Sequence, residues 1–314
     1  MNYKKFIITT TINKPTLAIM KYLLFKDWYL IVVGDLKTPH KEYKKLEKEF
    51  NNFQYLGPEY QEKKYKKISD LIGWNCIQRR NIGFLEAYNL GAEIIATVDD
   101  DNIPYDFWGK EVYVNKEIYV DFYTTSNPVF DPLSVTTEYN YLWHRGFPIQ
   151  LLDKKNKVRY KGKVKIKVLI QADLWDGDPD IDAIARIVYR PEVKFKNIKK
   201  PFTSNKISPF NSQNTFLSRE VIPYYACLPG IGRMDDIWGS YILQKYFPRS
   251  VIYNKPSVYQ KRNIHNLAKD LEKELLGYKY TFDLIKNLNQ FEKFLPNETK
   301  RFYKEWVRFF NNKT

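Results

Sequence analysis

The chain has 314 residues, of which 44% are hydrophobic, 17% aromatic and 28% charged. This composition supports a sizeable core and excludes intrinsic disorder of the whole chain. No apolar run reaches the roughly 18 to 20 residues that span a bilayer. Two cysteines far apart in sequence, Cys76 and Cys227, exclude a disulfide framework or a metal knuckle. A strand-like run starts close to Met1, so we expect no leader peptide and a reduced, cytoplasmic protein.

The net charge is +15, from 51 Lys plus Arg against 36 Asp plus Glu. Such a charge attracts phosphates, whether of nucleic acid, of nucleoside diphosphates or of an anionic membrane. An AT-rich coding bias would produce much of the same lysine excess. Eight basic residues and no acid occur between Lys154 and Lys167. Their alternation with Val and Ile predicts a hairpin with one basic face. The alternative is a solvated edge strand that its lysines protect from aggregation.

Strand and helix patterns alternate through the N-terminal third of the chain. In order, they are a strand at 5–13, a helix at 17–25, a strand at 28–35, charged helical sequence at 40–67, a helix after Asn75 that Gly91 closes, and a buried strand before Asp99. This alternation predicts an α/β fold with a mostly parallel sheet. Ligands bind such sheets at the carboxyl ends of the strands, where 9–13, Asp35 and Asp99–Asp101 fall.

The second half is less regular and ends in helical, amphipathic sequence. We find no internal repeat and no low-complexity linker. The simplest organisation is a catalytic domain at residues 1–262 and a helical C-terminal extension at residues 263–314. The basic aromatic end of this extension would either rest on an anionic membrane or pack on the core.

Three consecutive carboxylates, Asp99–Asp101, follow the buried strand. Residues i and i+2 of an extended chain face the same side, so Asp99 and Asp101 can address one cation together. Oxygen ligands suit Mg²⁺ or Mn²⁺, which keep open positions for substrate phosphates. The alternative is a solvated acidic turn that nearby lysines stabilise.

Two arginines precede a helix start, and two acids precede another. Arg79 and Arg80 lie where backbone N–H groups favour an anion, although a surface arginine pair is the alternative. Asp235 and Asp236 either cap their helix or serve as a general base towards a hydroxyl.

The segment ADLWDGDPDIDA starts like a calcium loop. Ile181 stands where that loop requires Gly, and Ile187 where it requires Glu, which excludes an EF-hand. Trp175 beside Asp178 and Asp180 is instead typical of a surface that binds sugar. The alternative is an acidic turn beside a core tryptophan.

The ordered set of these motifs resembles the nucleotide-sugar glycosyltransferases of the GT-A fold. The motif R-x-N-x-G-x-x-x-A precedes a strand, and an aspartate triplet follows that strand. WHRGFPIQLL, LIQADLWDGDPDIDA and PGIGRMDDIWGSYIL are similar to successive signatures of the reversibly glycosylated polypeptides, a family that includes the plant UDP-arabinopyranose mutases. VVGDLKTP and RGFP resemble the related STELLO-type glycosyltransferases. The resemblance covers roughly residues 5 to 265.

The resemblance implies roles for particular residues. Residues implied to contact base and ribose are Thr9, Thr10 and Asp35, and Arg79 or Arg80 would lie close to the phosphates. The triplet would form a D-x-D-type site, in which Asp99 and Asp101 hold the metal and Asp100 lies at the nucleotide. His265 would be a further metal ligand, with a surface or capping histidine as the alternative.

The acids before the late helix match the position of the general base in inverting GT-A enzymes. We favour Asp236, with Asp235 as the alternative. Arg145 matches the arginine implicated in self-glycosylation in the mutase family. Because a guanidinium is a poor nucleophile, substrate positioning is an equally good role for Arg145.

We therefore expect a cytoplasmic, metal-dependent GT-A glycosyltransferase, inverting, that uses Mn²⁺ or Mg²⁺ and a UDP-sugar donor. Its acceptor would be a glycan, a glycolipid or a protein, and the protein would bind no nucleic acid. A UDP-sugar mutase is the first alternative, and a non-catalytic basic scaffold or nucleic-acid-binding protein the second. Peripheral membrane contact and an oligomer stay open.

Overall fold

The computed structural model describes residues 3–262 and 266–311. Within these residues, eleven strands join in one sheet. The strands are β1 (Lys5–Thr11), β2 (Trp28–Gly34), β3 (Phe53–Leu56), β4 (Ile94–Val98), β5 (Asn102–Pro104), β6 (Glu117–Thr125), β7 (Val158–Lys167), β8 (Ile170–Gly177), β9 (Phe202–Ser204), β10 (Asn214–Ser218) and β11 (Val251–Gln260).

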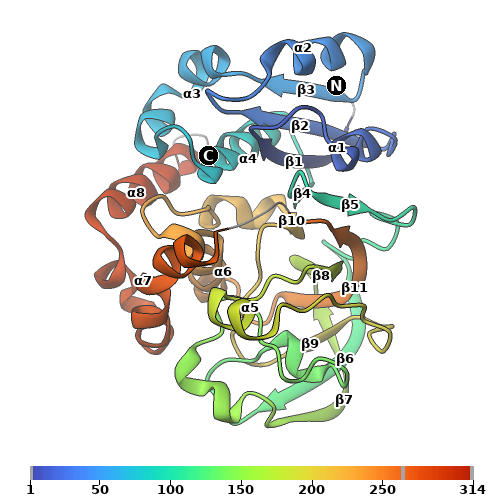
Figure 1. Ribbon diagram of the computed structural model, residues 1–314, viewed down its shortest axis with the longest axis vertical. Coiled ribbons are helices and arrows are strands. Elements are labelled where there is room, and N and C mark those ends of the chain that lie inside the picture. Colours follow the sequence, from blue (N-terminus) through green and yellow to red (C-terminus); the bar gives the residue numbers. More distant parts are fainter. Residues whose placement is uncertain (1–2, 263–265, 312–314) are drawn as a thin grey trace.

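Helices connect these strands and pack around the sheet (Figure 1). The α-helices are α1 (Leu17–Tyr22), α2 (His40–Glu49), α3 (Pro58–Ile72), α4 (Arg80–Asn89), α5 (Ala183–Tyr189), α6 (Asp235–Tyr246), α7 (Leu267–Lys286) and α8 (Asn297–Asn311). Short 3₁₀ helices are η1 (Ile77–Arg79), η2 (Pro132–Val135), η3 (Ile149–Lys154), η4 (Arg219–Tyr224), η5 (Gly232–Met234) and η6 (Leu288–Phe294).

The sheet runs from β3 at the top of Figure 1 to β7 at the bottom, in the order β3-β2-β1-β4-β10-β8-β11-β9-β6-β7. Parallel pairing joins β3, β2, β1 and β4, and recurs between β8 and β11 and between β9 and β6. β10 is antiparallel to both of its neighbours, and β5 pairs antiparallel with β11 outside the main order. The predicted α/β fold is confirmed.

The parallel strands at the N-terminal end bring the polar residues that follow them to one edge. All seven residues of β2 are buried, as expected for a strand with both faces covered. A glycine, Gly83, allows α4 to lie close to the sheet, since a Cβ there would clash with Ile8 and Val33. This close packing holds the first residue of α4, Arg80, against the end of β4.

The basic segment forms one edge strand, so the predicted hairpin is wrong. After η3 ends at Lys154, the chain turns into β7, which pairs antiparallel with β6. The lysines of β7 are exposed, whereas Val164 and Ile166 turn inward. The strand that pairs with β7 is β6, from an earlier part of the chain, and β7 lies at the end of the strand order. The edge-strand alternative is therefore confirmed.

The C-terminal helices pack on the core. Phe302, Trp306 and Phe310 of α8 are buried, and Trp306 donates a hydrogen bond of 3.2 Å from Nε1 to the carbonyl of Ile222. Figure 1 shows α7 and α8 beside α6 and α4. Of the two alternatives for these aromatic side chains, the structure shows packing. The division at residues 262 and 263 stays a prediction.

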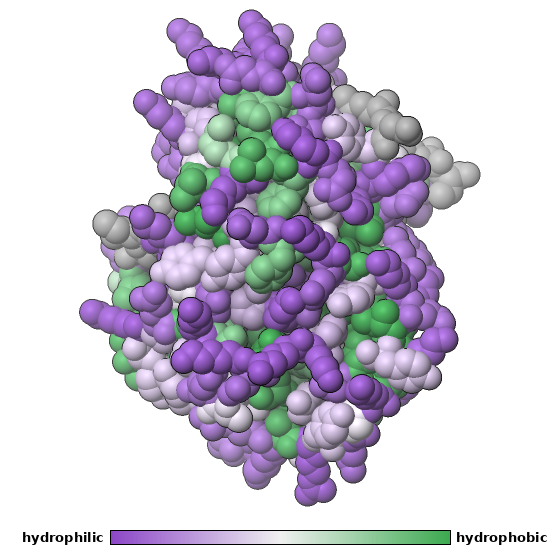
Figure 2. Space-filling model, turned by 90° about the vertical axis from the view of Figure 1, so that its right-hand side faces the viewer, coloured by the Kyte–Doolittle hydropathy of each residue, from purple (hydrophilic) through white to green (hydrophobic). Residues whose placement is uncertain are grey.

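Hydrophilic side chains cover most of the face seen in Figure 2, and apolar side chains gather there only in small patches. No helix within residues 3–262 and 266–311 combines the length and the apolar composition that crossing a bilayer requires.

The packing of α8 predicts that this helix stabilises the whole molecule. Trp306→Ala is expected to lower the free energy of unfolding by about 3–5 kcal/mol, because it leaves a cavity and an unpaired carbonyl. Denaturant unfolding measures this change. The exposed neighbour Lys304 provides the control, since Lys304→Ala should change stability by less than about 0.5 kcal/mol. Equal effects of the two substitutions would contradict the packing.

Candidate active site

A cavity of about 530 Å³ opens at the carboxyl edge of the parallel strands. Its wall comes from the ends of β1 and β4, from η1 and α4, from η5 and α6, and from α7. The ionisable residues that line it are Arg80, Asp99, Asp100, Asp101, Arg145, Asp180, Arg233, Asp235, Asp236, Arg262 and Lys273, together with Cys76. A smaller cavity of about 290 Å³ adjoins it at Thr10, Asn75, Cys76, Ile77 and Asp100, and extends to Asp35.

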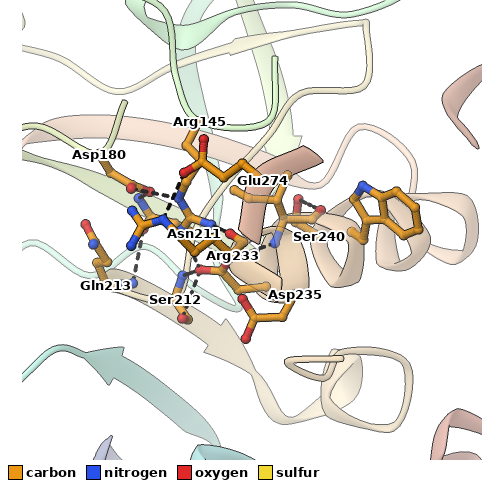
Figure 3. A network of polar contacts seen from close by, with 12 residues as sticks. Arg145, Asp180, Asn211, Ser212, Gln213, Arg233, Asp235, Ser240 and Glu274 are labelled. Atoms are coloured by element: carbon orange, nitrogen blue, oxygen red, sulfur yellow. Dashed lines mark hydrogen bonds and ion pairs between the residues drawn. The ribbon is translucent and has the colours of Figure 1, made fainter. Parts of the chain in front are cut away.

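One arginine holds two carboxylates at the centre of the site (Figure 3). Arg145 donates from Nε to Asp180 Oδ1 at 2.8 Å, and from its two terminal nitrogens to the Asp236 oxygens at 2.9 and 3.1 Å. It also donates to the carbonyl of Arg233. All three ion-paired side chains are buried. A forked guanidinium matches the paired oxygens of a carboxylate, so this geometry fixes the orientation of Asp236.

Asp236 is the fully satisfied member of the acid pair. Besides Arg145, its oxygens accept hydrogen bonds from the Ser212 N–H at 2.9 Å, the Ser212 hydroxyl at 3.0 Å and the Ile237 N–H at 2.9 Å. Burial alone would raise the pKa of Asp236, but Arg145 outweighs it and lowers this pKa below its ordinary value. Asp236 is therefore a stable anion and a weak base.

Asp235 lies in a different environment, although it is adjacent in sequence. Its Oδ2 accepts a hydrogen bond of 2.6 Å from the Gln78 amide. Burial, reinforced by the negative charge of Asp236, raises the pKa of Asp235 to about 7. A carboxyl with this pKa, lining a cavity, can take up a proton near neutral pH.

The acidic triplet lies on the wall formed by β1 and β4. Asp99 forms an ion pair with Arg80, whose guanidinium also donates to the Thr97 hydroxyl at 2.9 Å and to the carbonyl of Ser212. Burial alone would lower the pKa of Arg80, but Asp99 raises it. Asp100 turns to the neighbouring strand, where it accepts from Thr11 at 2.5 Å and Asn13 at 3.0 Å.

Asp99 and Asp101 fit a divalent cation that is completed by substrate oxygens. Both line the cavity, and Arg80 engages one oxygen of Asp99. Within the described residues, no group of three or more His, Cys, Asp or Glu side chains is placed to hold a metal on its own. Mg²⁺ in nucleotide sites uses one or two carboxylates together with phosphates and waters. Asp99 and Asp101 supply the two carboxylates. The third predicted ligand, His265, lies outside the described residues.

The residues predicted to contact the nucleoside are placed as follows. Thr10 lines both cavities and donates from its hydroxyl to the carbonyl of Val33 at 2.9 Å. Asp35 lines the smaller cavity and accepts from the N–H groups of Asn75 at 2.9 Å and Cys76 at 3.0 Å. Thr9 is buried within β1.

The two predicted phosphate arginines separate in the structure. Arg80 lines the cavity, whereas the Arg79 guanidinium stacks 3.6 Å from the ring centre of Trp74. Arg79 also donates to Gln61 at 2.9 Å and to Ser69 at 3.0 Å. Burial lowers the pKa of Arg79 to about 10. Arg79 therefore supports the loop before η1, and Arg80 is the arginine at the cavity.

The predicted sugar surface is also divided. Trp175 is 1% exposed and packs against Phe195 and His144, so its ring presents no face to a sugar. Asp178 forms ion pairs with Arg186 and Arg262 beside the cavity. Asp180 lines the cavity, where it is bound to Arg145 and accepts from Asn211 at 2.7 Å.

Several residues of the site carried no signal in the sequence. They are polar or basic residues from separate elements: Gln78, Ser212, Gln213, Arg233, Gln260, Arg262 and Lys273. Arg233 lies within the GIGRMDD motif, so proximity to the acid pair could have indicated it. The others could be found only once the fold brings their elements together.

Curated relatives match most of this chain. No family model matches it. "Probable glycosyltransferase STELLO1" and "Probable glycosyltransferase STELLO2" of Arabidopsis thaliana are 23% and 24% identical to it over 230 and 232 residues. Each match covers 68% of this chain but only 29% of the relative. The predicted resemblance to STELLO-type glycosyltransferases is confirmed, and the resemblance to the reversibly glycosylated polypeptides stays a prediction.

Two solved structures are similar at 10% sequence identity. One is glucosyl-3-phosphoglycerate synthase from Mycobacterium tuberculosis in complex with phosphoglyceric acid, with a TM-score of 0.46 over 90% of this chain and 79% of that one. The other is a mannosyltransferase from Pyrobaculum calidifontis in complex with GDP-Man and Mn²⁺, with a TM-score of 0.43 over 98% and 70%.

Removal of Arg145 should destabilise the molecule strongly. Arg145→Met leaves Asp180 and Asp236 buried without their cation, which is expected to cost about 3–5 kcal/mol of unfolding free energy at pH 7. Arg145 also lowers the pKa of both carboxyls, against burial, which alone would raise it. The ion pairs of Arg145 therefore contribute fully to the free energy of unfolding above about pH 3.9, the pKa of an Asp in the unfolded chain. This contribution is lost as the pH falls further.

Urea unfolding between pH 3 and pH 7 measures both effects. The wild-type protein should lose stability towards pH 3, and Arg145→Met should lose less. Arg301→Met, at an exposed position of α8, is the matched control. A loss of less than about 1 kcal/mol in Arg145→Met would show that the ion pairs do not hold the site.

Proposed function

We propose that this chain is a GT-A glycosyltransferase that moves a sugar from a nucleotide sugar to an acceptor hydroxyl. The observation that carries this proposal is the different environment of two adjacent carboxyls in one cavity, where Arg145 binds Asp236 and Gln78 donates a hydrogen bond to Asp235. Asp236 is held ionised by Arg145, and Asp235 has a pKa of about 7. Such pairs, whose environments push their pKa values apart, are typical of acid–base catalysis. The likeness to the STELLO relatives supports the same class.

The donor would lie along the edge of β1 and β4. Its nucleoside would enter the smaller cavity beside Thr10 and Asp35, and its diphosphate would lie near Asp99, Asp101 and Arg80. A Mg²⁺ or Mn²⁺ ion at Asp99 and Asp101, when bound, supplies positive charge that stabilises the departing diphosphate. UDP is the nucleotide that the resemblance favours.

Asp235 would act as the general base. Its carboxylate accepts the proton of the acceptor hydroxyl while that oxygen attacks the anomeric carbon, and the nucleoside diphosphate leaves from the opposite side with inversion. The resemblance alone favours Asp236 as the base. The geometry of the site leads us to propose Asp235 instead. A carboxylate that already accepts five hydrogen bonds or ion-pair contacts has little affinity for another proton.

Arg145 would hold Asp236, the neighbour of the base, in place. It is buried and bound to two carboxylates, and although burial alone would lower its pKa, Asp180 and Asp236 raise it well above its ordinary value. A guanidinium in this state is a poor nucleophile, which speaks against self-glycosylation at Arg145 and so against the mutase alternative.

Donor binding should require the triplet and a divalent cation. Calorimetric titration with UDP and Mn²⁺ is expected to show binding that EDTA abolishes and that Asp101→Asn weakens by about 10- to 100-fold. Asp153→Asn, at an exposed position in η3, should leave the affinity unchanged. Equal affinity with and without the cation would contradict the metal site.

The base assignment predicts a pH profile. With wild-type protein, kcat/KM should rise as the pH increases through about 7, because Asp235 must be ionised to accept a proton, and then level off. Asp235→Asn should lower kcat by about 10²- to 10⁴-fold and leave UDP affinity unchanged. A profile that falls with rising pH, or a variant with nearly full activity, would refute Asp235 as the base.

A further inference from the structure

The cations that line the cavity differ in whether they are neutralised. Arg80 pairs with Asp99, and Arg145 with Asp180 and Asp236. Arg233 pairs with Glu274 at 2.8 Å and with Asp270 at 3.4 Å, and Arg262 with Asp178 at 3.3 Å. Within residues 3–262 and 266–311, Lys273 is the lining cation for which the structure has no ion pair. Its charge is therefore available to a ligand.

The backbone of Lys273 is held firmly at the cavity although its side chain is exposed. Gly232 of η5 lies so close to the Lys273 carbonyl that a Cβ at this glycine would clash with it, and its φ of +69° also favours glycine. The next residue, Glu274, is buried and accepts from Arg233 at 2.8 Å and from the Ala183 N–H at 2.7 Å. This docking of α7 keeps Lys273 at one place on the rim.

That place is the side of the cavity from which Asp235 extends. Gly230, Gly232 and Arg233 line the cavity beside Lys273, and η5 runs directly into Asp235. The metal carboxylates Asp99 and Asp101 come from the end of β4, a different part of the wall. A ligand at Lys273 would therefore lie with the group that approaches Asp235.

We propose that Lys273 binds a phosphate or carboxylate group of the acceptor and thereby selects an anionic hydroxyl compound. This inference rests on the proposed function, because it assumes that the acceptor hydroxyl approaches Asp235. The ammonium attracts the anion in a partly enclosed, polar site, while the hydroxyl of the same molecule reaches the base. Helix α7 would then contribute directly to acceptor specificity.

The test is calorimetric titration of the protein preloaded with a nucleoside diphosphate and Mg²⁺. Glycerol phosphate and glycerol are the matched anionic and neutral probes. Wild-type protein should bind glycerol phosphate and not glycerol, and Lys273→Ala should weaken this binding by about tenfold or more. Lys273→Arg should retain it, and Lys269→Ala, at an exposed position one turn away on α7, should not change it.

Each outcome decides between the alternatives. No binding of glycerol phosphate to wild-type protein, or equal binding to Lys273→Ala, overturns the inference. If Lys273→Ala instead weakens binding of the nucleoside diphosphate, the lysine serves the donor phosphates, and the acceptor assignment is wrong. If no nucleoside diphosphate binds wild-type protein, the proposed function itself fails. Glycerol phosphate is therefore also titrated into nucleotide-free protein. This titration tests Lys273 even where no nucleoside diphosphate binds.

Discussion

The site depends on one arginine that holds two acids. Arg145, between η2 and η3, bridges Asp180 after β8 and Asp236 at the start of α6. These three residues come from distant parts of the chain, and the ion pairs fix the distance between the elements that carry them. Arg145 lowers the pKa of Asp236, whereas burial and the negative charge of Asp236 raise the pKa of the adjacent Asp235 to about 7. Two neighbouring carboxyls therefore differ in their affinity for a proton.

The C-terminal helices belong to this arrangement. Glu274 of α7 binds Arg233, whose carbonyl in turn accepts from Arg145. α8 packs its aromatic face on η4 through Trp306. The helical extension thus contacts Arg145 through Arg233 and contributes Lys273 to the cavity rim. Buried residues of α7 and α8 pack in the same hydrophobic cluster as the strands of the sheet.

Local patterns in the sequence predict the α/β fold, the triplet at a strand end and the two acids at a helix start. Each of these is encoded within a few consecutive residues. The different environments of Asp235 and Asp236 could not be predicted, because they depend on Arg145, which lies 91 positions away from Asp236. The same reason applies to β7, whose partner β6 is remote, and to Trp175, whose burial depends on Phe195 and His144. Arg79 and Arg80 are adjacent in sequence, so the sequence predicts the same phosphate contact for both. The structure places only Arg80 at the cavity.

The measurement that tests the central claim most directly is chromatography of reactions with a panel of nucleotide sugars and Mn²⁺. Both free nucleoside diphosphate and any isomerised sugar nucleotide would be quantified. We predict that one donor releases its nucleoside diphosphate and that EDTA stops this release. Formation of an isomer without release would contradict transfer in favour of a mutase. No release and no isomer from any donor would contradict the catalytic account altogether.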